Sequence, residues 1–265
     1  MARAIDGEVI TAPQQSGPGF SLACLEEGSE IAEALRVNMA TGSISESTLE
    51  RITMPTGGST TWSFSSQGND VTTKEIVGVP CYFATRYTLW PSVSASGGKM
   101  PVLIATDSLL AHRVSDDIGD LDPEQLEAAR VGDRTYSLER LSYAQWGSGK
   151  GGRGKRIRES RMICLLREGD AWPMLIQAGA MSCEALSKFF VTLSAPYYQC
   201  VIGLSLEKRT NGSGEPYAVI KPRTVGKLSR EQGKVISETY TAMLRRMFQG
   251  IGASSAPAPG DDFPA

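Results

Sequence analysis

Positive charge is concentrated between residues 150 and 167, where seven lysine or arginine side chains accompany one acidic residue, Glu159. The formal net charge of the whole chain is only −2, so this concentration is a local feature. Glycines at positions 147, 149, 151, 152 and 154 allow the backbone here to approach a ligand closely. Because several cations along a polymer release its counterions together, the segment is typical of a site for a polyanion such as a nucleic acid.

The same segment holds Gly149, Gly154 and Lys155 at the spacing of the phosphate loop of nucleotide hydrolases. However, Arg156 stands where that loop needs a serine or threonine to hold magnesium, and no apolar strand precedes it. We therefore interpret the segment as a contact for backbone phosphates, and an ordinary solvated loop is the alternative that charge alone leaves open. The residues assigned to these contacts are Lys150, Arg153, Lys155, Arg156, Arg158 and Arg161.

Aromatic side chains can complete such a site, because bases of any sequence stack on rings and gain roughly 1–3 kcal/mol per base. Arg86 adjoins Tyr87, and Trp146 directly precedes the basic segment, so these are the preferred positions. Most strand aromatics belong to a core, and burial is the competing interpretation for each ring. The predicted stacking residues are Arg86, Tyr87, Trp90 and Trp146, with Trp62, Phe64, Tyr82, Tyr197 and Tyr198 as further candidates.

The two ends of the chain have the composition of flexible segments. Residues 1–20 are predicted to form an N-terminal arm, and residues 250–265 a disordered acidic tail. The tail ends with Asp261, Asp262 and Phe263, which are expected to contact the protein's own basic surface or a partner protein. A frayed terminus without a role is the alternative.

Other kinds of chemistry find little support in the sequence. No G-x-S-x-G elbow, H-E-x-x-H motif or acidic cluster in an apolar frame marks a catalytic set, so we expect no enzyme and no cofactor. A lone histidine, His112, cannot build a multi-histidine metal site. The cysteines are too widely spaced for a zinc site and are expected to be buried, reduced thiols: Cys24, Cys81, Cys164, Cys183 and Cys200.

No run of 18 apolar residues and no apolar signal-peptide core occurs, so we expect a soluble, cytoplasmic protein without a membrane partner. Short strands punctuated by glycine and proline predict an α+β protein, built on an OB-like barrel with insertions and peripheral helices. Its single domain is placed at residues 21–249, with an acidic segment at 107–130 and a basic loop at 147–161 as insertions.

Periodicity predicts the individual elements. Strands are expected near 62–64, over 74–90 and at 101–106, with hairpins at 162–178 and 199–221. Helices are expected at 21–39, 123–130 and 182–193, the last capped by Ser182. A final helix is expected from Ser229, where Gln232 completes a capping box.

The block GKGGRGKRIRESRMICLLREGDAWPMLIQ, followed by LSKFFVTLSAPYY and VIGLSLEKRTNGSGEPYAVIKP, resembles a family of uncharacterised bacteriophage and mobile-element proteins. The resemblance covers residues 147–221 well and 51–248 loosely. Members of that family carry cysteines suited to zinc just before the basic loop, whereas residues 134–146 contain none here. The overall plan also looks like the OB-fold single-stranded-DNA-binding proteins of phages such as T7.

Together these features predict a sequence-nonspecific single-stranded-DNA-binding protein that acts in phage or mobile-element replication or recombination, inside a bacterial host. One alternative is an adaptor or inhibitor whose basic loop meets an acidic host-protein surface. A second alternative is a metal-dependent nuclease or recombination enzyme that uses carboxylates among Asp107, Asp116, Asp117 and Asp120.

Overall fold

The computed structural model describes residues 22, 37, 45–66, 68–92 and 100–249, with only the backbone at 66, 69, 150 and 249. The predicted arm, the predicted tail and most of the predicted helix at 21–39 lie outside the described residues. The strands are β1 (Arg51–Ile52), β2 (Trp62–Ser66), β3 (Asn69–Thr73), β4 (Glu75–Leu89), β5 (Leu103–Thr106), β6 (Leu110–Arg113), β7 (Thr135–Ser137), β8 (Ile157–Leu166), β9 (Met174–Ala178), β10 (Cys200–Thr210) and β11 (Pro216–Lys227).

Helices flank this sheet and join its strands. The α-helices are α2 (Pro123–Ala129), α3 (Ala180–Val191), α4 (Arg230–Ile236) and α5 (Ala242–Gln249), and η7 (Ser237–Thr241) is a π-helical turn between α4 and α5. The 3-10 turns are η2 (Glu46–Thr48), η3 (Leu138–Arg140), η4 (Ser142–Ala144), η5 (Lys150–Gly152) and η6 (Tyr197–Gln199).

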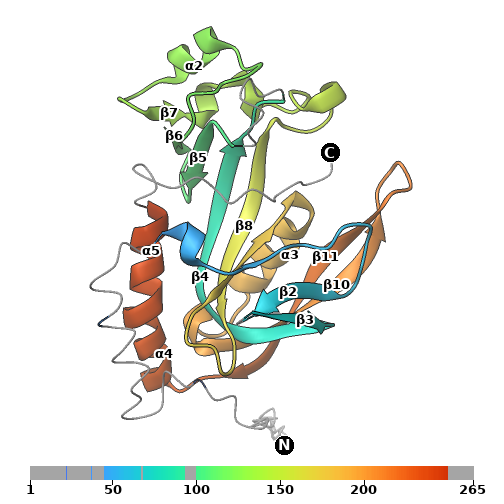
Figure 1. Cartoon of the computed structure of the whole chain (residues 1–265), viewed down its shortest axis with the longest axis vertical. Coiled ribbons are helices and arrows are strands. Elements are labelled where there is room, and N and C mark those ends of the chain that lie inside the picture. Colours follow the sequence, from blue (N-terminus) through green and yellow to red (C-terminus); the bar gives the residue numbers. More distant parts are fainter. Residues whose placement is uncertain (1–21, 23–36, 38–44, 67, 93–99, 250–265) are drawn as a thin grey trace, which may run out of the picture.

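The long strand β4 organises the sheet. Its residues 75–78 pair with β10, residues 79–89 pair with β8, and residues 86–89 also pair with β5. The main path runs β1-β9-β8-β4-β5-β6-β7, while β11 pairs with β10 and β2 pairs with β3 in a separate sheet. The strand β4 therefore connects a lower part, which carries α3 and the β10–β11 hairpin, to an upper part that carries β5–β7 and α2 (Figure 1).

The prediction of a mixed α+β fold with a strand-rich sheet is confirmed. Among the described strands the sheet is not closed into a barrel, because β1 and β7, at the two ends of the path, pair with β9 and β6 and not with each other. Within the described residues, no helix is both long enough and apolar enough to span a membrane.

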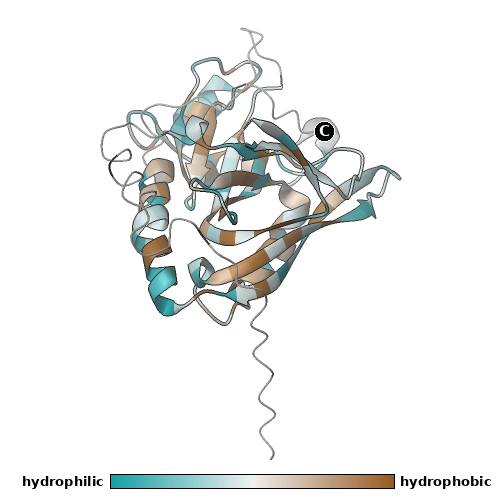
Figure 2. Ribbon diagram, turned by 60° about the horizontal axis from the view of Figure 1, so that its bottom comes forward, coloured by the Kyte–Doolittle hydropathy of each residue, from teal (hydrophilic) through white to brown (hydrophobic). Residues whose placement is uncertain are grey.

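The lower part is layered on both faces of β8. Met162, Cys164 and Leu166 point into one core cluster, which also contains residues of α4, η7 and α5. The alternate residues Ile163 and Leu165 point into a second cluster, shared with α3 and β10. Burial on both faces explains why the second half of this strand, residues 162–166, is apolar at every position. Figure 2 shows hydrophobic residues along the strands in the interior of the molecule.

The upper part has its own core. Apolar residues of β5–β7 and α2 form this cluster, including Leu103, Ala111, Leu126 and Tyr136. Leu89 and Ile157, at the upper ends of β4 and β8, belong to the same cluster. The predicted acidic segment is therefore part of a packed unit, and its helix α2 is capped by Asp122.

The cysteines inside the described residues are buried, as predicted, and no disulfide joins any two of them: Cys81, Cys164, Cys183 and Cys200. Cys24 lies outside the described residues. Burial raises the pKa of Cys183 to about 11, so its thiol is protonated at neutral pH and is a poor nucleophile.

The prediction that Ser182 caps a helix is wrong. The helix α3 begins at Ala180 after Gly179, and the Ser182 hydroxyl instead accepts a hydrogen bond of 3.1 Å from the backbone N–H of Ile220 in β11. This hydroxyl is buried and ties the helix to the neighbouring strand.

Ser182→Ala is expected to lower the free energy of unfolding by about 1–3 kcal/mol, because the buried Ile220 N–H would lose its acceptor. Urea unfolding of the variant measures this directly. Ser194→Ala, at an exposed position after the same helix, is the control and should change stability by less than about 0.5 kcal/mol. Equal stability of the two variants would contradict the role assigned to Ser182.

Candidate nucleic-acid interface

The glycine-rich loop between η4 and β8 is closed by its own backbone. The N–H of Gly147 donates to the carbonyl oxygen of Gly154 at 2.7 Å, and the N–H of Gly149 donates to the same oxygen at 3.3 Å. Four glycines of the loop have positive φ angles, which residues with a side chain rarely adopt. The angles are 92° at Gly147, 66° at Gly151, 74° at Gly152 and 64° at Gly154. The glycines are therefore required by the shape of the loop.

Trp146 lies at the base of this loop and is 82% exposed. The bond between Gly147 and Gly154 places Trp146 and Lys155 on the two sides of the base. Arg153 and Lys155 are both exposed, and neither has a hydrogen bond or ion pair with the rest of the described residues. One loop thus carries an exposed aromatic ring and two exposed cations. We refer to Trp146, Arg153 and Lys155 as the Trp146 surface.

The next predicted cation, Arg156, is held from several sides. Its Nη2 donates to Asp120 Oδ1 at 2.6 Å and to Ser92 Oγ at 3.2 Å, and its Cζ lies 5.2 Å from the centroid of the Tyr143 ring. The backbone N–H of Arg156 donates to Ser148 Oγ at 3.0 Å. Arg156 therefore fixes one end of the loop to the acidic segment. For Lys150 only the backbone is described.

The two cations on β8 do not share a face. Arg158 pairs across the ladder with Thr88 and is exposed. Arg161, an odd number of residues further along, points to the opposite face. There it donates to Glu159 Oε1 at 2.7 Å and to Ser187 Oγ at 3.0 Å. The predicted basic residues 150–161 are thus divided between the loop and both faces of a strand.

Arg86 cannot stack on a base as predicted, because it is buried, with 2% of its surface exposed. Its Nη1 and Nη2 donate to the two carboxylate oxygens of Glu46 at 2.6 Å each. Its Cζ lies 5.5 Å from the centroid of the Phe248 ring. Arg86 therefore belongs to an internal ion pair that links β4 to η2.

The other predicted stacking residues fall into two groups. Tyr87 and Trp90, on and after the upper end of β4, are half-buried. Burial, with the charge of Glu159 as a smaller contribution, raises the pKa of Tyr87. The further candidates Trp62, Phe64 and Tyr82 are corrected to core residues, and Trp62 Nε1 donates to the carbonyl oxygen of Leu204 at 2.9 Å.

Several contacts of the structure were not predicted from the sequence. Phe83 of β4 stacks on Phe190 of α3 with ring centroids 3.9 Å apart, and Tyr197 meets Phe190 edge-on at 6.3 Å. Two ion pairs also join distant parts of the chain. Asp120 and Arg156 are 36 positions apart, and Glu46 and Arg86 are 40 positions apart. Side-chain pairing across such distances leaves no periodic signal in one sequence.

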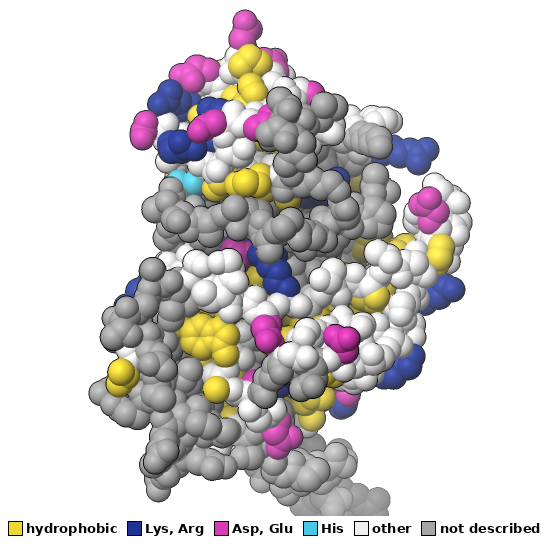
Figure 3. All heavy atoms as spheres, viewed as in Figure 1, with side chains coloured by type: hydrophobic (Ala, Val, Ile, Leu, Met, Phe, Trp, Pro, Cys, Tyr) yellow, Lys and Arg dark blue, Asp and Glu magenta, His cyan; other side chains and the backbone are white. Residues whose placement is uncertain are grey.

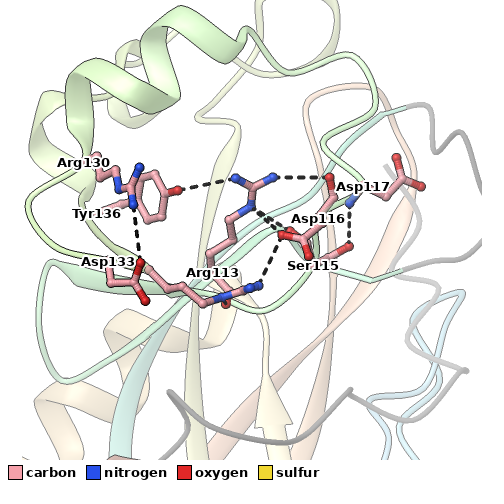
Figure 4. A network of polar contacts seen from close by, with 8 residues as sticks. Arg113, Ser115, Asp116, Asp117, Arg130, Asp133 and Tyr136 are labelled. Atoms are coloured by element: carbon pink, nitrogen blue, oxygen red, sulfur yellow. Dashed lines mark hydrogen bonds and ion pairs between the residues drawn. The ribbon is translucent and has the colours of Figure 1, made fainter.

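The carboxylates of the acidic segment are interleaved with arginines. Asp116 Oδ1 lies 3.4 Å from Arg113 Nε and 3.3 Å from Arg134 Nη2, and Arg113 Nη1 also donates to the hydroxyl of Tyr136 at 3.5 Å (Figure 4). Figure 3 shows charges of both signs mixed over this upper part of the molecule. Within the described residues, no three His, Cys, Asp or Glu side chains are grouped to hold a metal ion.

Comparisons with known proteins give no relative for this chain: no family model matches it, and no match was found among the curated proteins or the solved structures.

Proposed function

We propose that this chain binds single-stranded nucleic acid, and single-stranded DNA in particular, through the Trp146 surface. The observation that carries the proposal is a tryptophan that is 82% exposed on the same loop as two exposed cations without partners in the described residues. An indole ring offers a ligand a large apolar face together with a polar N–H group. Stacking on a base and pairing with phosphates use both features at once.

The arrangement favours a single strand over a duplex. In a duplex the base faces are stacked on each other, so Trp146 would have access to a base face only after unstacking. A single strand offers both an open base face and a nearby phosphate. The contacts go to rings and phosphates and not to base edges, so binding is expected to be independent of sequence.

The proposal also includes the biological role of the protein. We infer that the protein acts in phage or mobile-element DNA replication or recombination, in the cytoplasm of a bacterial host, and that it is not an enzyme. An OB-like arrangement of the strands and a partner-binding tail at Asp261, Asp262 and Phe263 complete this picture, and those tail residues lie outside the described part of the chain. The role of the Trp146 surface does not depend on either.

Fluorescence anisotropy of labelled oligonucleotides tests the proposal. Single-stranded DNA should bind more tightly than the same sequence as a duplex, and a contact with two phosphates should weaken with salt with a slope of about −1.4 in log K against log[salt]. An equally strong interaction with a duplex would contradict it. Capture of an acidic protein without any oligonucleotide binding would favour the adaptor alternative, and magnesium-dependent shortening of the oligonucleotide would favour a nuclease.

Gly149→Ala should weaken binding by distorting the loop. A Cβ at this position would collide with the carbonyl oxygen of Arg153, so the loop has to open and move that cation. We expect the affinity for single-stranded DNA to fall by about fivefold, the loss that accompanies one phosphate contact near 0.1 M salt.

The matched control is Gly212→Ala, in the turn between β10 and β11, where no atom lies within 4 Å of the added Cβ. Both variants should keep their free energy of unfolding to within about 1 kcal/mol. If Gly149→Ala bound as tightly as the control, the shape of the loop would have no part in binding.

A further inference from the structure

The guanidinium of Arg156 is held through one of its two terminal nitrogens. Its side chain is 18% exposed, and Nη2 is occupied by Asp120 and Ser92. Nε is buried without a hydrogen-bond partner. Nη1 has no partner among the described residues and, unlike Nε, is not sealed from water. The two N–H groups of Nη1 are therefore left for a ligand at the end of the glycine-rich loop.

Three segments hold this guanidinium in place. Asp120 comes from the acidic segment, Ser92 follows β4, and Tyr143 supplies the ring beneath the guanidinium plane. Asp120 Oδ1 also accepts from the backbone N–H of Ser92 at 2.7 Å, so the carboxylate joins two of the segments. An arginine that is fixed in this way loses little conformational entropy when it binds a phosphate.

We propose that Asp120 is a positioning residue, which holds Arg156 so that Nη1 receives a phosphate oxygen of the bound strand. This inference rests on the proposed function for its natural ligand, a nucleic-acid backbone. It assigns a binding role to a residue of the acidic segment, whose negative charge alone would repel that ligand. The contact adds a fixed phosphate site to the exposed cations of the Trp146 surface.

Two substitutions separate positioning from simple charge repulsion. Asp120→Ala removes the acceptor for Nη2 and should lower the affinity for single-stranded DNA about two- to tenfold, the cost of ordering one long side chain on binding. Asp120→Asn retains a carbonyl oxygen at the same place and should recover the affinity that the alanine variant loses. If Asp120 acted only by repulsion, both variants would bind more tightly than the original chain, and the inference would be wrong.

A spectroscopic signal reports on Arg156 itself. Because its Nε–H is buried, the proton exchanges slowly with water and should give a resolved ¹⁵N–¹H signal, which Arg156→Lys identifies by its loss. Titration with a single-stranded oligonucleotide, and separately with inorganic phosphate, should shift this signal in the original chain and in Asp120→Asn, and should shift it less in Asp120→Ala.

The outcomes distinguish the inference from the proposed function. Binding of the oligonucleotide without movement of the signal would overturn the role of Arg156 and Asp120 and leave the Trp146 surface as the site. If inorganic phosphate moved the Arg156 signal but the oligonucleotide did not bind, the fixed phosphate site would be supported and single-stranded DNA would be rejected as the ligand. An unmoved signal with both ligands would overturn the inference.

Discussion

Removing the ring and reversing the two cations of the Trp146 surface is expected to abolish most binding of single-stranded DNA. For the variant Trp146→Ala/Arg153→Glu/Lys155→Glu we expect the affinity to fall by about 100-fold or more near 0.1 M salt. Losing two phosphate contacts accounts for about 25-fold, and losing one stacked base accounts for roughly 1–3 kcal/mol. Anisotropy titrations at several salt concentrations measure the loss and should show a shallower dependence on salt.

The control reverses two charges at a distant place. Arg230 and Lys234 are exposed on α4, at the opposite end of the molecule from the upper end of β8, where the loop lies (Figure 1). Arg230→Glu/Lys234→Glu changes the net charge by the same amount and should retain most of the affinity. Equal losses in the two variants would mean that binding follows net charge and not the Trp146 surface. Trp146→Phe should keep part of the stacking energy.

Glu46→Ala is expected to lower the free energy of unfolding by about 3–5 kcal/mol, because it leaves the buried guanidinium of Arg86 without a counter-charge. Glu46 is 5% exposed, and its carboxylate accepts hydrogen bonds from both terminal nitrogens of Arg86 at 2.6 Å. Arg51 Nη2 contacts the same carboxylate at 2.7 Å. Chemical unfolding of the variant at pH 7 measures the effect.

The same ion pair predicts how stability depends on pH. Burial by itself raises the pKa of Glu46, but the guanidinium groups of Arg86 and Arg51 outweigh burial and hold the pKa below its ordinary value of 4.5. A carboxyl group with a lowered pKa in the folded state stabilises it above the unfolded pKa. This contribution should be fully present above about pH 5.5 and lost as the pH falls through the lowered pKa.

Two variants check this account of Glu46. Glu46→Gln cannot titrate, so the acid-dependent loss of stability should be smaller than in the original chain. Glu184→Ala removes one partner of an exposed pair, in which Lys188 Nζ lies 2.6 Å from Glu184 Oε1, and should lower the free energy of unfolding far less than Glu46→Ala. A Glu46→Ala variant as stable as Glu184→Ala would show that the buried pair contributes nothing beyond a surface one.

Local patterns in the sequence were sufficient to predict many of the elements. Alternating and β-branched residues predicted β4, a predicted hairpin matches β8 and β9, and the capping box of Ser229 and Gln232 is present at the start of α4. These features depend on neighbours in the chain or on one periodic face. The way β4 divides its pairing among β8, β10 and β5 depends on contacts between distant segments, which no local pattern records.

In the candidate site, too, local features were predicted and contacts between distant segments were not. The glycine-rich loop and the exposed Trp146 lie where the basic segment predicted them. The burial of Arg86 was missed because its partner, Glu46, lies in a short segment with no periodic pattern. Arg158 and Arg161 read as neighbours in the sequence, but the alternation of β8 turns them to opposite faces. Charge density along a chain therefore overestimates charge density on a surface.

Photo-crosslinking tests the position of the site most directly. A single-stranded oligonucleotide carrying bromodeoxyuridine would be irradiated with the full chain, and the crosslinked peptides identified by mass spectrometry. We predict that the main crosslink lies on Trp146 or within residues 146–156, and that an excess of unlabelled single strand removes it while an excess of duplex does not. Crosslinks confined to other segments, such as the β10–β11 hairpin, would contradict the Trp146 surface as the binding site.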